Sequence, residues 1–445
     1  MNRNLLIKLG AIAVLIVLLM IPIIMIDGMV EERQSLRDTV LEDIARSSSY
    51  SQKITGPLLV VPYRKTEREW KTHPKTGERY LEESERYGRL YVLPERFVLD
   101  GQVSTELRAR GIYQARLFQG ANHISGHFQI PAHYGISEDL ADYRFDTPFV
   151  SVGISDVRGI KNAPELVLGE QRLAFQPGSS ESLLGAGVHA PIPQLDTQQA
   201  QRLDYAFDLQ LQGTGRLDIT PVGRDSRISL SADWPHPSFV GEYLPSEREI
   251  TSGGFTALWQ TSFFATNLEE ALGECAFGGE CRNFESRHFG VSFVDPVDQY
   301  LKSDRALKYA LLFVVLTFAG FFLFEVLKRL AVHPVQYGLV GLSLAMFYLL
   351  LLSLAEHMDF ARAYALAAGA CVLLIGFYVS HVLRSWLRGA GFTVALAGLY
   401  AMLYALLSAE DYALLMGSLL VFGLLAAVMV LTRKLDWYGL AKPAA

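Results

Sequence analysis

Six hydrophobic segments constrain this chain more than any other feature of its sequence. The first covers residues 5–26 and is interrupted only by Lys8, and five more follow in the last third of the chain. About 20 predominantly apolar residues are needed to span a bilayer as a helix, so each segment is long enough to cross. The six expected spans are residues 5–26, 306–327, 336–354, 360–382, 390–407 and 412–431.

The charges that flank these spans predict their orientation, because cytoplasmic loops of membrane proteins carry an excess of Lys and Arg. One side of the predicted bundle carries Arg3, Lys8, Lys328, Arg329, Arg384, Arg388, Arg433, Lys434 and Lys442. The short loops of the other side carry Glu356, Asp359, Glu410 and Asp411, with Arg362 as the one basic exception. Both termini are therefore predicted to be cytoplasmic, and residues 28–305 periplasmic.

The same pattern divides the chain into five parts. Residues 1–27 are predicted to be an uncleaved signal-anchor helix, because the apolar core is long and no A-x-A cleavage site follows it. Residues 28–52 continue as an amphipathic helix beside the membrane, and residues 53–305 form the periplasmic domain. Residues 306–431 are expected to form a five-helix transmembrane bundle, and residues 432–445 a cytoplasmic tail.

The periplasmic part has the two-residue period of β-strands. Leu203, Tyr205, Phe207, Leu209 and Leu211 alternate with more polar residues, and glycine-rich turns separate such runs. The highly charged stretch 66–86 is expected to be a solvated hairpin tip or a mobile loop. The predicted fold is an α-helical membrane protein with six transmembrane helices. A large β-rich, sandwich-like domain is inserted between the first and second of them.

Composition and motifs exclude several classes of function. Residues 28–305 hold 29 Lys/Arg and 39 Asp/Glu, an acidic balance that is unsuited to nucleic acid. No P-loop and no H-E-x-x-H motif occurs, and the ten histidines are scattered without ligand spacing. We therefore expect no catalytic, cofactor or metal site and no enzymatic activity. The predicted partners are the lipid bilayer and an envelope protein or lipid, and the sequence leaves the oligomeric state open.

A rigid aromatic segment is the first candidate site. Trp234, His236, Ser238 and Phe239 lie around two prolines and could form a loop that contacts a partner. The alternative is a turn stiffened by proline that buries Trp234, and the residues themselves favour this alternative.

Polar residues at the ends of the spans are the second candidate set. Glu325, Glu356 and His357 lie within a turn or so of a predicted membrane boundary. Ionisable groups inside a membrane are costly and mark functional sites. Ion pairing of Glu325 with the neighbouring Lys328 and Arg329 is the alternative explanation.

Two of the three cysteines are close enough in sequence to pair. Cys275 and Cys281 flank a short loop with two glycines, which could bring their Cα atoms within disulfide reach. A periplasmic location would permit the oxidation. Two free thiols remain the alternative.

Several motifs together resemble a known family. They are Gly56-Pro57-Leu58, Trp234-Pro235-His236-Pro237-Ser238-Phe239, Leu244-Pro245, Trp259-Gln260-Thr261-Ser262-Phe263, Asp304-Arg305-Ala306-Leu307-Lys308-Tyr309-Ala310, His333-Pro334-Val335-Gln336-Tyr337-Gly338-Leu339-Val340-Gly341-Leu342 and Asp436-Trp437-Tyr438. With these motifs the chain resembles the CreD family of inner-membrane proteins nearly end to end. The cysteine pair is not part of that resemblance.

The resemblance implies a role in cell envelope integrity and envelope stress response, under a two-component regulatory system. It also implies altered tolerance to nuclease colicins and a link to the β-lactam response, and it carries no catalytic residues. We therefore expect a non-enzymatic inner-membrane protein that binds an envelope component through its periplasmic domain.

Two other functions stay open from the residues. The first is a transporter or flippase of a small or lipidic substrate, in which Thr317, Ser343, Ser353 and Thr393 would have to line a polar path through the bundle. The second is a periplasmic enzyme. It would require clustering of Asp156, Arg158, His189 and His236, which are scattered in the sequence.

Overall fold

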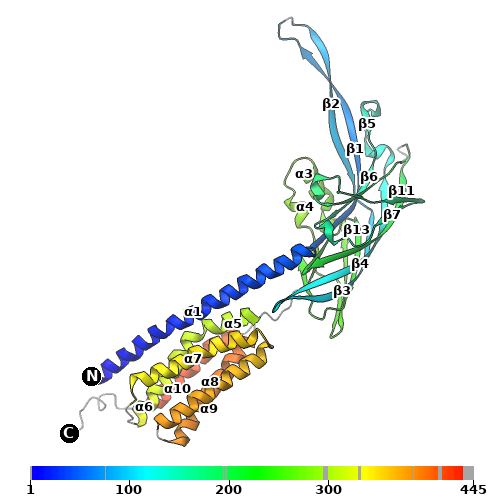
Figure 1. The fold of residues 1–445 in the computed structure, drawn as a ribbon. Coiled ribbons are helices and arrows are strands. Elements are labelled where there is room, and N and C mark those ends of the chain that lie inside the picture. The colour runs from blue at the N-terminus through cyan, green and yellow to red at the C-terminus, as the bar shows by residue number, and fades with distance from the viewer. Residues whose placement is uncertain are drawn as a thin grey trace, which may run out of the picture. The chain divides into compact units, whose positions relative to one another are not determined.

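The computed structural model describes residues 3–75, 77–193, 195, 198–293, 299–328, 332–383, 385–408 and 413–433 (Figure 1). The chain forms two compact units. One is helical and comprises residues 1–38 and 297–445; the other is β-rich and comprises residues 39–296. The first helix contributes to both units.

That first helix is continuous across the expected boundary at residue 27. α1 (Arg3–Ser47) has 45 residues and contains Pro22 without ending there. The signal-anchor segment and the amphipathic segment are thus one helix, since no strong helix-terminating sequence separates the apolar run from the charged run that follows. α1 ends at Ser47, where the Ser47 and Ser48 hydroxyls both donate to the Ile44 carbonyl.

The helical unit continues with six helices after the β-rich unit. α7 begins at Pro334, whose preceding residue His333 is the N-cap of a capping box with Gln336. This is the first-turn role expected of a proline. The helices are α5 (Gln299–Lys308), α6 (Ala310–Lys328), α7 (Pro334–Ala355), α8 (Phe360–Val382), α9 (Trp386–Ser408) and α10 (Ala413–Thr432).

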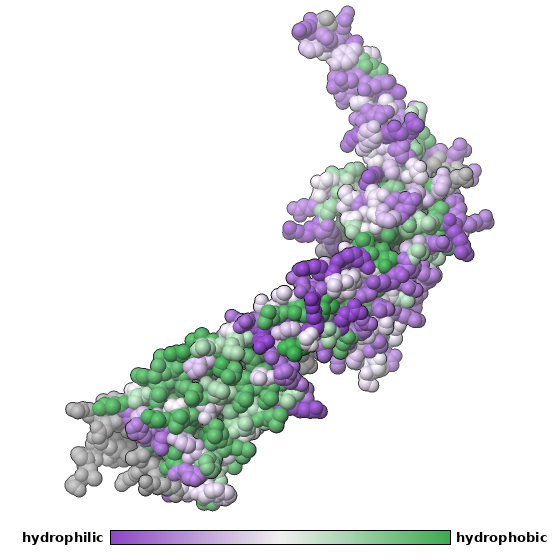
Figure 2. Space-filling model, viewed as in Figure 1, coloured by the Kyte–Doolittle hydropathy of each residue, from purple (hydrophilic) through white to green (hydrophobic). Residues whose placement is uncertain are grey.

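Helix length and composition account for most of the expected spans. Among the described residues, α1, α7, α8 and α9 are each long and apolar enough to cross a membrane. α5 and α6 form a pair bent by 46° that can count as a fifth span. α10 lies where the sixth span was expected. A total of six crossings stays a prediction. The face of the helical unit seen in Figure 2 is largely hydrophobic, as lipid contact requires.

The boundary between the β-rich and helical units differs from the expected one. The sequence pattern assigned residues up to 305 to the periplasmic domain, whereas the helical unit already includes residue 297. α5 is amphipathic, and it buries Tyr300, Ser303, Ala306 and Leu307 within its own unit. Its polar residues concealed this apolar face from a simple count of hydrophobic residues.

The β-rich unit consists of two sheets. One has nine strands in the order β14-β17-β12-β1-β6-β10-β9, with β2 and β5 also paired to β1. The other has eight, in the order β15-β16-β13-β3-β4-β11-β7-β8. The strands are β1 (Gln52–Thr72), β2 (Arg79–Val92), β3 (Arg96–Arg110), β4 (Tyr113–Ile130), β5 (Tyr143–Phe145), β6 (Phe149–Ile154), β7 (Glu165–Leu168), β8 (Gln171–Ala174), β9 (Gln176–Pro177), β10 (Gly187–Pro191), β11 (Gln201–Thr214), β12 (Arg216–Thr220), β13 (Asp225–Ala232), β14 (Ser238–Gly241), β15 (Glu247–Thr251), β16 (Gly254–Ser262) and β17 (Phe289–Ser292). Three short helices follow β16: α2 (Phe263–Thr266), α3 (Leu268–Ala276) and α4 (Arg282–Ser286).

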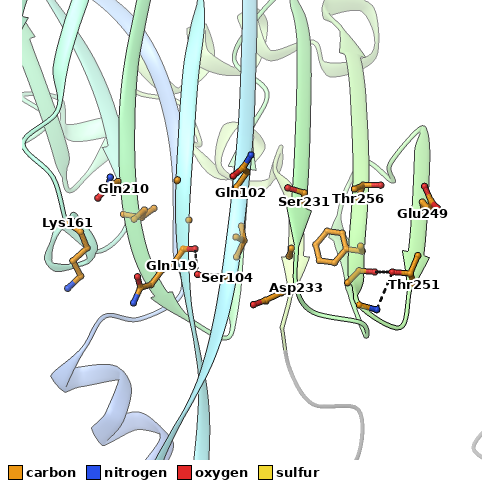
Figure 3. Close-up of a pocket in the computed structure, with 18 residues that line it drawn as sticks. Gln102, Ser104, Gln119, Lys161, Gln210, Ser231, Asp233, Glu249, Thr251 and Thr256 are labelled. Carbon is orange, nitrogen blue, oxygen red and sulfur yellow. Dashed lines mark hydrogen bonds between the residues drawn. The ribbon is translucent and has the colours of Figure 1, made fainter.

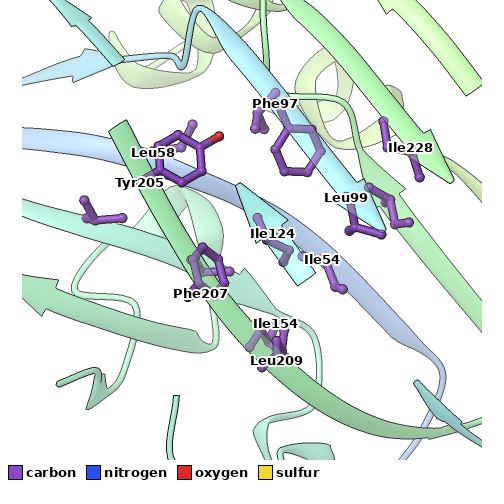
Figure 4. Packing of buried hydrophobic residues seen from close by; sticks show 14 of the residues in the cluster. Ile54, Leu58, Phe97, Leu99, Ile124, Ile154, Tyr205, Phe207, Leu209 and Ile228 are labelled. Atoms are coloured by element: carbon purple, nitrogen blue, oxygen red, sulfur yellow. The ribbon is translucent and has the colours of Figure 1, made fainter. Parts of the chain in front are cut away.

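Both sheets contribute to one hydrophobic core. Ile54 and Leu58 of β1 and Phe97 and Leu99 of β3 belong to the same buried cluster (Figure 4). The alternation expected for residues 203–211 is confirmed on β11, where residues 205, 207, 209 and 211 are buried and residues 208 and 210 are exposed. The β-rich module is therefore present, with the apolar half of each alternating strand turned toward this core.

Candidate functional site

A buried polar cluster joins the first helix to the bundle. Glu325 on α6 is 6% exposed. It forms an ion pair with Lys8 of α1 and accepts hydrogen bonds from the Tyr337 hydroxyl at 2.9 Å and the Val332 amide at 3.2 Å. Lys8 also donates to the Val332 carbonyl at 2.8 Å. Each charge is thus both paired and hydrogen-bonded, which is what burial of ionised groups in a membrane requires.

A second ion pair joins the same two parts further along α1. The Arg33 Nε lies 3.4 Å from the Glu356 carboxylate, at the C-terminal end of α7. The Tyr300 hydroxyl of α5 donates to the same carboxylate at 3.4 Å. The Arg37 guanidinium stands 5.7 Å from the centre of the Tyr300 ring. Two side chains thus contact Glu356, Arg33 from α1 and Tyr300 from α5.

The two ion pairs lie at the ends of one stripe on α1. Lys8 and Arg33 are 25 residues apart, about 38 Å along a helix. The hydrocarbon core of a bilayer is about 30 Å thick, and about 40–45 Å with its headgroups. Helical spacing places both cations on the same face of α1, and the residues of that face that lie between them are buried. Those residues are Ile12, Leu19, Ile23, Ile26 and Val30. The separation of the two ion pairs along α1 is thus comparable to the thickness of a bilayer, and an apolar seam lies between them.

A glycine allows close contact in the middle of this seam. A Cβ added to Gly341 of α7 would lie 2.1 Å from the Leu19 side chain and 2.9 Å from the Phe318 ring. Small residues let membrane helices approach closely. Gly341 therefore serves the packing of α7 against α1 and α6.

Two of the three membrane-boundary candidates are engaged by α1. Glu325 and Glu356 each pair with a cation of that helix, whereas His357 is exposed at the end of α7. The alternative partners of Glu325 were Lys328 and Arg329; the side chain of Lys328 and all of Arg329 lie outside the described residues. Sequence reasoning missed Lys8 and Arg33 as partners. Their position on the apolar stripe of α1 was the one available signal.

Three of the four hydroxyl groups considered for a polar transport path bond their own helices. Thr317 and Thr393 each donate to the carbonyl four residues earlier in their own helices, and so does Ser343. Ser343 is half-buried and Ser353 is exposed on α7. Hydroxyls that bond their own helix leave no polar surface for a substrate.

The β-rich unit carries a polar trough of about 920 Å³ on the outer face of its eight-stranded sheet (Figure 3). The register of the sheet aligns six side chains across six neighbouring strands. This row reads Glu249, Thr256, Ser231, Gln102, Ala121 and Gln210 from β15 to β11. Further hydroxyl and amide groups lie beside it on the same strands, from Ser104 and Gln119. The trough therefore presents short, mostly uncharged hydrogen-bonding side chains.

Strand alternation explains why this surface is polar. On β3, Gln102 lies between the inward residues Gly101 and Val103, and on β11, Gln210 lies between the buried Leu209 and Leu211. Successive side chains of a strand point to opposite faces of the sheet. Because one set is buried in the core, the other set must face the solvent. The polar half of the pattern was visible in sequence but was not recognised as a site.

A smaller hollow of about 490 Å³ continues the trough along the same strands. It shares Gln102 and Gln210 with the trough and adds Asp100, His123 and Asp208. The His123 Nδ1 lies 2.7 Å from the Asp208 carboxylate, and both side chains are exposed. The surface thus changes from uncharged to charged along the strands.

The aromatic segment around Trp234 is mostly turned inward. Trp234 is 5% exposed, its indole N–H donates to the His236 carbonyl at 2.8 Å, and the Arg116 guanidinium stacks 3.7 Å from its ring centre. Phe239 packs against Phe255 and Trp259. Of the four candidates, only His236 and Ser238 present exposed side chains. Trp234 occupies the buried turn that was the alternative explanation, because its large apolar ring gains more from burial than from exposure.

The residues considered for an enzymatic site separate into different surroundings. Asp156 and Arg158 pair at 2.6 Å. The bonded guanidinium holds the pKa of Asp156 below its usual value. Both residues hold the end of α1, through the Tyr50 amide and the Arg46 carbonyl. His189 instead bonds the Gly178 carbonyl, and the His236 ring meets the Trp234 ring edge to face. In the described part of the chain, no group of three or more His, Cys, Asp or Glu is placed to hold a metal.

Cys275 and Cys281 are bonded to each other in the structure, with Cα atoms 4.4 Å apart. Cys275 lies in the last turn of helix α3 and is buried, while Cys281 is the N-cap of α4. The bond joins the two short helices across the Phe277-Gly278-Gly279 loop. Cys371 is buried in the helical unit and is unpaired.

This pairing yields a first prediction. Denatured, unreduced protein from cells should take up one alkyl group per chain, on Cys371, and reduced protein should take up three. Mass spectrometry after alkylation measures both numbers. Reduction should lower the stability of the β-rich unit by about 2 kcal/mol, as expected for closure of so short a loop. Three reactive thiols without reductant would contradict both the bond and an oxidising location for residues 28–305.

Comparison with known proteins gives one extended match. A family model described as "Inner membrane protein CreD" matches residues 4–438. The Inner membrane protein CreD of Escherichia coli (strain K12) is 38% identical over 435 residues, which cover 96% of this chain and 92% of that protein. Among solved structures, a two-domain M1 zinc metallopeptidase aligns with 38% of this chain and 40% of its own. The alignment has 8% identity and a TM-score of 0.19, too low to support any argument.

Proposed function

Because the chain belongs to the CreD family of inner membrane proteins, we propose that it is a non-enzymatic protein that supports cell envelope integrity and the envelope stress response. It does so by binding an envelope component through the polar trough of its β-rich unit. The trough is the observation that carries this proposal, since it is a large concave surface lined by convergent hydrogen-bonding groups.

The proposed topology places the trough in the periplasm. Both termini lie in the cytoplasm and residues 28–305 outside, because basic residues gather on one side of the short loops and acidic residues on the other. The two ion pairs of α1 agree with this arrangement, because their separation suits the two membrane boundaries. α1 then connects the membrane-embedded helices directly to the first strand of the β-rich unit.

The side chains of the trough suit an uncharged, extended and hydrogen-bonding ligand. Gln102, Gln119 and Gln210 offer amides that both donate and accept, and Ser231 and Thr256 offer hydroxyls. Charged groups lie toward the margins, from Lys161, Asp233 and Glu249 (Figure 3). A protein or glycan segment laid across the strands would find a partner on each of them.

Site-specific photo-crosslinking tests this assignment in the full chain. A photoreactive amino acid at Gln119, in the trough, should give a discrete crosslinked product in intact cells. The same residue at Gln129 is the matched control, because Gln129 is an exposed glutamine on the same strand but does not line the trough. Equal products at both positions, or none at Gln119, would refute the trough as the binding site.

A blocking substitution provides the functional arm of the test. Ala121→Trp places an indole on the floor of the trough, at an exposed position where it need not disturb the core. Cells with this variant should lose the Gln119 crosslink and show the envelope defects of cells that lack the protein. Normal envelope function with a filled trough would contradict the proposal.

A further inference from the structure

The hairpin of β1 and β2 extends as a two-stranded ribbon away from the body of its sheet (Figure 1). The two strands pair continuously from Leu59↔Val92 to Thr72↔Arg79. β5 pairs with β1 only up to Lys65, so the last seven pairs, from Thr66↔Glu85 outward, form the free ribbon among the described strands. At about 3.4 Å per residue this ribbon is about 24 Å long.

Ion pairs stabilise the ribbon near its base, around Lys65 and Arg68. Arg68 bonds Glu83 across the two strands at 2.8 Å and also reaches Asp142 at 2.8 Å. Lys65 bonds Glu138 at 2.5 Å, which ties this base to the segment before β5. An isolated two-stranded hairpin is marginally stable in water, so such cross-links explain how the ribbon can hold its shape.

The end of the ribbon gathers exposed aromatic and apolar side chains with cations. Trp70 is 63% exposed, Tyr80 43% and Leu81 42%. Trp70 lies opposite Leu81, and Lys71 lies opposite Tyr80. The Arg79 guanidinium is 5.7 Å from the centre of the Trp70 ring. The excess of basic residues is confined to this end: residues 70–81 hold three Lys/Arg and one Asp/Glu, whereas residues 66–85 together hold four and six. Lys71 forms an ion pair with Glu82.

This combination points to one kind of partner. Trp and Tyr prefer the headgroup level of a bilayer, and Lys and Arg are attracted to anionic lipid. A stable protein–protein interface needs about 20–30 residues on each side, more than the narrow end of a ribbon offers. A lipid surface needs no such area, because a few amphipathic side chains can insert between headgroups.

We propose that the end of this ribbon docks on an anionic lipid surface other than the bilayer that holds α1. β1 starts at Gln52, shortly after α1 ends at Ser47, and the docking residues lie about 20 residues further along that strand. The tip therefore lies at the opposite end of β1 from the helix that enters the membrane. The proposal is independent of the polar trough, which lies on the other sheet.

Vesicle flotation with the full chain tests the proposal. The protein is held in nanodiscs of phosphatidylcholine and mixed with separate vesicles, made either of phosphatidylcholine alone or of equal parts phosphatidylcholine and phosphatidylglycerol. It should float with the anionic vesicles and bind the neutral ones at least about tenfold less. Binding should weaken as salt rises from about 0.05 M to about 0.5 M, because the screening length shortens.

Variants assign the effect to the tip. Trp70→Ala combined with Tyr80→Ala should reduce anionic-vesicle binding at least about tenfold. Lys71→Glu combined with Arg79→Glu should abolish both the binding and its salt dependence. Tyr87→Ala is the matched control, because Tyr87 is 71% exposed and lies opposite Arg64 at the base of the same hairpin, outside the free ribbon. Unchanged thermal unfolding shows that each variant is folded.

Three results would overturn the proposal. They are absence of wild-type binding at low salt, equal binding to both vesicle types, and equal loss in the Tyr87→Ala control. Capture of a protein by a photoreactive residue at Tyr80, without any vesicle binding, would show that the tip recognises a protein instead.

Discussion

Lys8→Met should destabilise the helical unit by about 3–5 kcal/mol, the cost of breaking a buried ion pair from one side. Among the described residues, Glu325 is 6% exposed and would keep only its hydrogen bonds to Tyr337 and the Val332 amide. The measurement is the unfolding of the purified full chain in detergent micelles. Lys308→Met is the matched control, because Lys308 pairs with Asp304 on the exposed face of α5. That change should cost no more than about 0.5 kcal/mol.

The double variant Lys8→Met/Glu325→Leu should recover much of this loss. Removing both charges leaves two apolar side chains on the seam, and such replacements of buried ion pairs are often close to neutral. Glu325→Leu alone should cost less than Lys8→Met, because the longer lysine side chain can extend toward the headgroups. A coupling energy of about 1–3 kcal/mol is expected from the cycle. Additive single effects would show that the two side chains do not interact.

Trp259→Ala should destabilise the β-rich unit by about 3–5 kcal/mol, as expected for truncation of a large core aromatic. Trp259 is fully buried, stacks on Phe289 with ring centres 5.1 Å apart, and lies 5.6 Å from Phe239. Its indole N–H donates to the Tyr243 carbonyl at 3.2 Å, and that bond would also be lost. The measurement is thermal or denaturant unfolding followed by near-ultraviolet circular dichroism.

Trp70→Ala provides the matched control for this substitution. The residue change is identical, but Trp70 is 63% exposed at the end of the ribbon, so its loss should shift stability by less than about 0.5 kcal/mol. Equal destabilisation by the two substitutions would contradict the assignment of Trp259 to the core. The same Trp70 variant should nevertheless impair vesicle binding, which separates its surface role from folding.

Local patterns in the sequence predicted the elements that depend on local chemistry. The apolar run that ends at Ile26 predicted the first helix, and the apolar run over residues 336–354 predicted α7. The alternation from Leu203 to Leu211 predicted β11 and the burial of its apolar side chains from Tyr205 onward. These predictions succeeded because hydrophobic length and strand pleating each act within one continuous segment.

Predictions that required long-range partners were incomplete. Glu325 was recognised as unusual, but its cation lies 317 residues away on α1. Trp234 was considered as a partner contact, yet it is covered by the Arg116 guanidinium from β4. The small polar residues of the trough attract no notice in the sequence, because Ser, Thr and Gln are ordinary residues for the exposed face of a strand.

The amino-acid sequence by itself therefore determined the membrane-embedded character of the chain, its β-rich insertion and its family, because hydrophobic length and periodicity are written in consecutive residues. Only the tertiary structure decided that Lys8 meets Glu325, that six strands align their polar side chains into one trough, and that Trp70 and Tyr80 share an exposed tip. Those outcomes depend on which segments pair across large separations. Pairing is set by strand register and helix packing together, and no local pattern specifies it.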